Sequence, residues 1–108
     1  IPTGTAAVSL NVTKPDGSNG VVEFVRVSLQ YQHDITPYLG WRLQSPSGTI
    51  HDLIQPFTNN VSNGDIYFDM GVSGFYGEDM EGPWSLIVDN LSNRGGIIYK
   101  WGIEVYGN

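Results

Sequence analysis

The fold is decided by the stretch Leu39-Gly40-Trp41-Arg42-Leu43-Gln44-Ser45-Pro46-Ser47-Gly48-Thr49-Ile50. Large apolar residues occupy every second position from Leu39 to Leu43, with glycine and polar residues between them. A period of two is typical of a β-strand with one buried face and one solvated face. In the segment Ser45–Gly48, proline at the second position and glycine at the fourth favour a type I turn. A new extended segment begins at Thr49, so the stretch predicts strand, tight turn and strand.

Length and composition indicate a single all-β domain. The chain has 108 residues, of which 40% are hydrophobic, with 14 glycines and 6 prolines spread along it. That length allows one hydrophobic core and leaves no room for a second. No window repeats apolar residues at helical spacing, and the glycine and proline positions are typical of short strands joined by turns. We interpret residues 1–5 as the end of a linker and residues 6–108 as the domain.

Six further extended segments are predicted outside the central strand. They cover residues 6–13, 21–33, 49–54, 65–70, 84–89 and 97–105. The long second segment is expected to bend or bulge near Glu23 and Phe24. The glycine-rich segment 71–82 is too irregular for a strand and is interpreted as a long crossing. These elements predict an antiparallel, jelly-roll-like β-sandwich of about seven or eight strands.

Alternation assigns side chains to the core. The last segment is predicted to turn one apolar stripe inward, made of Ile97, Tyr99, Trp101, Ile103 and Val105. The three tryptophans, Trp41, Trp84 and Trp101, all fall on inward stripes. Burial of each such side chain stabilises the fold by about 1.5–3 kcal/mol or more.

The charge pattern excludes several classes of function. Five basic residues against eleven acidic ones give a net charge of −6, and such a surface repels nucleic-acid phosphates. No apolar run approaches the roughly 20 residues that cross a bilayer. The chain has no cysteine, which excludes a thiolate zinc site and leaves the redox compartment open.

Catalysis within this chain is not expected. The only histidines are His33 and His51, and no motif specifies a nucleophile turn or an oxyanion hole. We expect His33 to end the long strand and to hydrogen-bond a neighbouring loop, and His51 to lie on an exposed strand face.

Calcium is the cofactor that the sequence permits. Hard oxygen ligands gather in two loops, around Asp16 and around the segment 78–81. Neither loop has the spacing of an EF-hand, and solvated acidic loops remain an alternative. The first candidates for ligands are Asp65, Glu78 and Asp79.

Four aromatic residues fall at predicted strand ends or on the crossing: Tyr38, Tyr67, Phe75 and Tyr76. Exposed together, Tyr38, Phe75 and Tyr76 would dock another domain or stack on a sugar ring. The alternative is that they cap the open end of the sandwich. The sequence leaves both possibilities open.

Several short motifs occur together in an order and spacing that resemble one known family. They are His33…Leu39…Leu43, Ser45-Pro46-Ser47-Gly48-Thr49, Gly77-Glu78, Gly82-Pro83-Trp84-Ser85-Leu86, Asp89 and Gly96-Ile97…Trp101…Tyr106-Gly107. Over roughly residues 21–107 the chain resembles the P domain, also called the Homo B domain. P domains follow the subtilisin-like catalytic domain of proprotein convertases such as kexin and furin, and of many bacterial secreted serine proteases. The chain departs from the family pattern at Tyr38, where an aspartate is usual, and at Ile66, where a tryptophan is common.

The resemblance implies a non-catalytic domain that supports the folding, stability or substrate access of a secreted serine endopeptidase. The partner would be a protease catalytic domain upstream in the same chain, the location would be extracellular, and the isolated fragment would be monomeric. A free-standing module that binds glycan or an insoluble protein substrate is the alternative, because one sandwich fold hosts many functions. A structural spacer in a surface protein is a third possibility.

Overall fold

The computed structural model describes residues 1, 3–33, 38–54, 64–92 and 94–107, with the backbone alone at 64 and 65. All of its regular elements within these ranges are β-strands. They are β1 (Gly4–Val12), β2 (Val22–His33), β3 (Leu39–Gln44), β4 (Ile50–Ile54), β5 (Gly64–Val72), β6 (Gly82–Asn90) and β7 (Gly96–Gly107). Each of the seven segments predicted from the sequence overlaps one of these strands, with ends that differ by a few residues.

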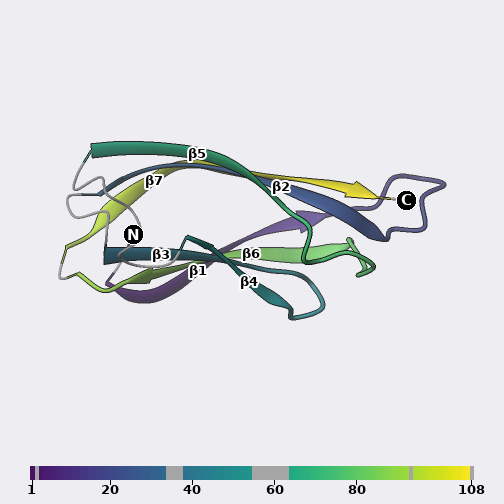
Figure 1. The fold of residues 1–108 in the computed structure, drawn as a ribbon, viewed down its shortest axis with the longest axis horizontal. Helices are drawn as coiled ribbons and strands as arrows, with labels where there is room; N and C mark the ends of the chain where they lie inside the picture. Colours follow the sequence, from purple (N-terminus) through teal and green to yellow (C-terminus); the bar gives the residue numbers. More distant parts are fainter. Residues whose placement is uncertain (2, 34–37, 55–63, 93, 108) are drawn as a thin grey trace.

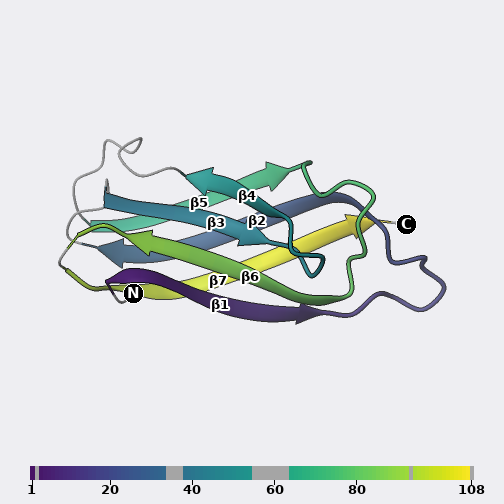
Figure 2. The same cartoon turned by 90° about the horizontal axis from the view of Figure 1, so that it is seen from below.

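The strands form two antiparallel sheets that face each other. One sheet has the order β1-β6-β3-β4 and the other the order β5-β2-β7. Figure 1 shows the two layers edge-on, with the three-stranded sheet above the four-stranded one. Seen from below in Figure 2, β1 and β7 run along one edge of the sandwich, while β4 and β5 run along the other. The predicted antiparallel sandwich is therefore confirmed, with seven strands in the described residues.

The central strand β3 has the predicted alternation. Leu39, Trp41 and Leu43 are buried, and Arg42 and Gln44 are only partly covered on the opposite face. The turn that follows is closed by a hydrogen bond of 3.0 Å from the Gly48 N–H to the Ser45 carbonyl. Gly48 has φ of +97°, a conformation that glycine adopts without steric cost. Beyond the turn, β4 pairs with β3 as an antiparallel hairpin.

The long strand β2 contains the predicted irregularity. Its pairing with β7 shifts register between Val22 and Phe24. A bulge places one extra residue in a strand and reverses the alternation beyond it. Val22 and Val25 are consequently both buried, although in a regular strand residues three positions apart point to opposite faces. From Val25 the alternation continues regularly to His33.

The predicted inward stripe of β7 is wrong at its first two positions. Ile97 and Tyr99 are each 53% exposed, whereas Ile98 is partly buried against the core. The register with β2 shifts at this point, because Gln30 pairs with Lys100 while the next residue, Tyr31, pairs with Ile98. Tyr99 is the additional residue. The inward residue that follows Ile98 is therefore Trp101, and beyond Trp101 inward and outward positions alternate.

The core lies between the sheets and is closed at one end by the crossing from β5 to β6. Trp41 and Trp84 are fully buried, while Trp101 is partly buried and packs against the core. The crossing, visible in Figure 1 as the green segment that leaves the upper layer for the lower one, places Phe75 in this core. The Phe75 ring meets Trp84 edge-on at 5.1 Å and 81°. In the part of the chain that the structure describes, no helix is long and apolar enough to span a membrane.

Candidate functional site

His33 is a structural residue at the end of β2. Its side chain is fully buried, and its Nε2 lies 2.9 Å from the Arg94 carbonyl and 3.3 Å from Ser92 Oγ. Asn90 completes this cluster, because its Nδ2 donates to the same carbonyl at 2.7 Å and its Oδ1 accepts from Ser92 Oγ at 2.6 Å. The arrangement fixes the loop between β6 and β7, as the sequence predicted for His33.

The same geometry argues against a serine nucleophile at this cluster. A catalytic histidine must accept the proton of the serine hydroxyl at its free nitrogen. Here the Nε2 of His33 faces a carbonyl oxygen, which only accepts, so Nε2 carries the proton. Ser92 Oγ meanwhile donates to Asn90. The pair is therefore arranged to hold a loop and not to activate a nucleophile.

His51 on β4 also has a structural role. Its Nε2 lies 3.0 Å from the Gly74 carbonyl, and its ring meets Phe75 edge-on at 4.7 Å. The side chain is partly buried, in contrast to the exposed position that the sequence predicted. His51 thereby attaches the β5–β6 crossing to the four-stranded sheet.

The three predicted calcium ligands do not share one site. The backbone of Asp65 pairs with Gln32 near the end of β2, whereas the Glu78 carbonyl accepts the N–H of Val22 at the start of that strand. At about 3.3 Å per residue, the length of β2 separates them by roughly 30 Å. The carboxylate of Glu78 accepts a hydrogen bond of 2.6 Å from Ser45 Oγ. Asp65 was therefore wrongly grouped with the other two, because a sequence does not show which loops meet.

The two acidic loops themselves come together at the end of the molecule near the start of β2. A polar hollow of about 270 Å³ lies between them, lined by Lys14, Asn19, Gly20, Asp79 and Glu81. The backbone N–H of Lys14 donates to the Glu81 carboxylate at 3.1 Å. Among the residues described, no three His, Cys, Asp or Glu side chains are placed to hold a metal ion. Calcium binding in these loops stays a prediction.

The predicted aromatic cluster does not exist as one surface. Phe75 is fully buried, so its assignment to an exposed interface was wrong, because the glycine-rich crossing folds inward at this residue. Tyr38 is 39% exposed and lies beside the end of β6, where its carbonyl accepts the N–H of Leu91. Tyr76 is 75% exposed and lies on the crossing near the beginning of β6. A single glycan or protein surface built on Tyr38 and Tyr76 would have to extend along the length of β6.

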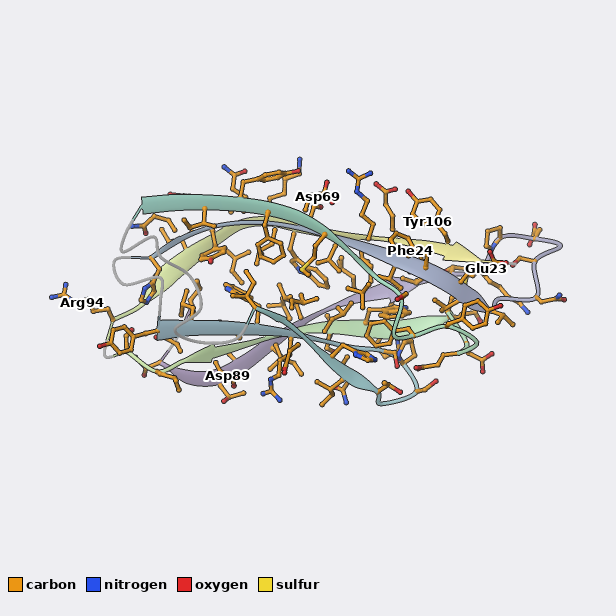
Figure 3. The ribbon with its side chains drawn as sticks, in the orientation of Figure 1. Glu23, Phe24, Asp69, Asp89, Arg94 and Tyr106 are labelled. Atoms are coloured by element: carbon orange, nitrogen blue, oxygen red, sulfur yellow. The ribbon has the colours of Figure 1, made fainter. Side chains whose placement is uncertain are left out.

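An exposed cluster that the sequence did not predict lies on the outer face of the three-stranded sheet (Figure 3). Arg26 donates two hydrogen bonds of 2.7 Å to the carboxylate of Asp69. Phe24 and Tyr106 lie beside this pair with ring centroids 6.2 Å apart. The Tyr106 hydroxyl donates to Glu104, and this bond raises the pKa of Tyr106 above its ordinary value. Alternation does place Arg26 on an outward face, but it does not identify a partner on β5.

Comparison with known proteins identifies the family of this chain. Residues 22–105 match the family model of the proprotein convertase P-domain. The chain belongs to this family. The P-domain match includes the His33 cluster, the buried Phe75 and the Arg26–Asp69 pair, and it begins after β1. Comparison with curated protein sequences gives no significant match.

Two solved structures have the same fold as this P domain. A crystal structure of the serine protease of Aeromonas sobria superposes with a TM-score of 0.76 at 21% identity and covers 97% of this chain. A structure of the Aeromonas sobria serine protease in complex with the chaperone ORF2 superposes with a TM-score of 0.68 at 22% identity, again over 97% of this chain. The P domain spans only 23% and 20% of the lengths of those two chains.

The Arg26–Asp69 pair of the P domain makes a pH-dependent contribution to stability. Hydrogen bonds from Arg26 lower the pKa of Asp69 below its ordinary value. A depressed folded pKa stabilises the protein above the unfolded pKa, near 3.9, and this contribution is lost as the pH falls through the folded pKa. We expect Asp69→Asn to lower the urea midpoint slightly near neutral pH, with the difference from wild type shrinking as the pH falls through the lowered folded pKa of Asp69. An undiminished difference in acid would show that the effect of Asp69 is not electrostatic.

Proposed function

We propose that this P domain is the non-catalytic accessory domain of a secreted serine endopeptidase of the subtilisin/kexin type. In that protein it follows the catalytic domain and supports its folding, stability or substrate access. The observation that carries the proposal is the P-domain family match over residues 22–105. The family is an accessory, non-catalytic part of subtilisin-like proteases.

The described side chains agree with an accessory role. Both histidines hold loops through backbone carbonyls, and the Ser92 hydroxyl beside His33 donates its proton to Asn90. The chain also spans about a fifth of the length of the protease structures that it resembles. A small sandwich of this kind contributes to a protease by burying surface against it, and stable interfaces bury about 800 Å² on each partner.

The experiment that tests this function removes residues 1–108 from the parent protease. Titration of active sites with an irreversible inhibitor measures the yield of active enzyme with and without the domain. We expect deletion to reduce that yield by about tenfold or more, because unfolded catalytic domain is lost to aggregation and proteolysis. A parent protease with the domain replaced by an inert linker of similar reach is the control. Equal yields in all forms would contradict the proposed function.

The same deletion, assayed with and without a chelator, tests whether this domain is the source of a calcium dependence. Secreted proteases with oxygen-rich loops gain stability when calcium binds the folded state only. We propose that any calcium dependence arising in this domain belongs to the loops around Asn19, Asp79 and Glu81, because the structure brings these loops together. Yield and half-life that respond equally to a chelator with and without residues 1–108 would place the calcium elsewhere.

A further inference from the structure

Apolar side chains that face the interior from β1 remain exposed. In the antiparallel pairing of β1 with β6, Val8 lies opposite Leu86 and Leu10 lies opposite Trp84. Directly paired residues point to the same side of a sheet. Leu86 and Trp84 are 1% and 0% exposed, yet Val8 is 41% and Leu10 is 37% exposed. The four-stranded sheet therefore extends beyond the cover that the other sheet supplies.

The facing strand β7 shows the same incomplete cover. Trp101, Ile103 and Val105 pair with residues of β2 that are at most 1% exposed, but these three side chains are themselves only partly buried. Figure 2 shows β1 and β7 along the same edge of the sandwich. We call this surface the open edge: it consists of the inward-facing apolar residues of β1 and β7, namely Ala6, Val8, Leu10, Val12, Ile98, Trp101, Ile103 and Val105.

The open edge is concave where the two strands begin. An apolar hollow of about 140 Å³ is lined by Ile1, Ala6, Ala7, Val8, Leu86, Val88 and Ile98. Ile1 is held beside β7, because its backbone nitrogen donates to the Gly96 carbonyl and its carbonyl accepts the Gly96 N–H at 3.2 Å. A domain joined ahead of Ile1 would therefore meet the molecule at this hollow.

The backbone of β1 is also unprotected. β1 is an edge strand, and its nine residues, GTAAVSLNV, pair with β6 in one continuous register. Natural edge strands are commonly protected by charged side chains, proline or bulges. β1 contains no charged residue and no proline, and its register has no bulge. Such a strand is typical of an edge that a partner covers.

We propose that the open edge is the surface that docks the protease catalytic domain of the same chain. This inference rests on the proposed function and adds the location of the interface. Two observations favour this partner over a second copy of the domain: the position of Ile1 in the hollow, and the four- to five-fold greater length of the protease chains with this fold. The occupant supplies apolar side chains that complete the cover over Val8 and Leu10.

Thiol labelling of the intact parent protease tests the proposal. The domain has no cysteine, so Val8→Cys and Asn11→Cys each introduce one thiol into it. Asn11 is exposed on the same strand but faces the opposite side of the sheet, which makes it the matched control. We expect a charged maleimide to label Val8→Cys about tenfold or more slowly than Asn11→Cys, because labelling requires local opening of the interface. Mass spectrometry of the tryptic peptide gives both rates.

Equal labelling rates at the two positions would overturn the proposal, and so would protection of Val8→Cys that depends on protein concentration, which would indicate a second copy. As a second measurement, Leu10→Asp in the parent protease is expected to reduce active-enzyme yield about tenfold, and Asn11→Asp is expected to leave it unchanged. If deletion of residues 1–108 lowers the yield but Leu10→Asp does not, the accessory function stands and the open edge is not the interface. If deletion has no effect, the function itself fails.

Discussion

Replacing Phe75 with alanine is expected to lower the free energy of unfolding of the domain by about 3–5 kcal/mol. The ring is fully buried and makes edge-on contacts with Trp84 and His51, so its removal leaves a cavity among well-packed aromatic neighbours. Urea unfolding followed by tryptophan fluorescence measures the change, since Trp84 lies beside the substituted position.

Tyr76→Ala is the control for this prediction. Tyr76 is the next residue in the chain but is 75% exposed, so its substitution is expected to change stability by no more than about 0.5 kcal/mol. Similar losses from both substitutions, or a loss from Tyr76→Ala alone, would contradict the burial of Phe75 and would return the exposed aromatic surface to consideration.

His33→Ala is expected to cost about 2–4 kcal/mol, because it removes a buried hydrogen bond to the Arg94 carbonyl and leaves a cavity. Asn90 still contacts that carbonyl, so the loop between β6 and β7 should loosen without losing its path. Hydrogen exchange of the Ser92 and Arg94 amides is expected to accelerate in the variant.

His51→Ala is the matched comparison, because this histidine is only partly buried and makes one hydrogen bond of similar length. Its cost is expected to be about half that of His33→Ala or less. A larger effect at His51 than at His33 would show that the crossing, and not the β6–β7 loop, depends more on its histidine.

Local patterns in the sequence predict most of the fold. The alternation from Leu39 to Leu43 places the central strand, and the segment Ser45–Gly48 places the turn, because both features depend on neighbouring residues alone. The bulge near Phe24 was also predictable, since the apolar period changes phase there.

The residues whose burial was predicted wrongly from the sequence are positioned by contacts between distant segments of the chain. Three large apolar residues follow one another at Ile97, Ile98 and Tyr99, so alternation cannot locate the extra residue that turns Ile97 outward. Phe75 lies in a glycine-rich segment without periodicity, and its burial is determined by the space left between Trp84 and His51. Predictions based on the spacing of apolar residues fail where that spacing is ambiguous or has no regular period.

The candidate sites were less predictable than the fold for the same reason. Composition identifies Glu78 and Asp79 as acidic loop residues, but only the pairing of β2 with β5 shows that Asp65 lies near the opposite end of β2. The exposure of Val8 likewise depends on how far one sheet extends beyond the other. Strand order and sheet overlap are global properties, and one sequence does not encode them as a local signal.

The central claim is that this domain stabilises a protease catalytic domain, and the most direct test is the thermal inactivation of the parent enzyme carrying Phe75→Ala. The substitution lies in the core of this domain alone. If the two domains support each other, the half-life of peptidase activity should shorten about tenfold or more relative to both wild type and Tyr76→Ala, because unfolding of one domain removes the cover from the other. An unchanged half-life, with the domain itself already unfolded at the temperature of the assay, would contradict the account.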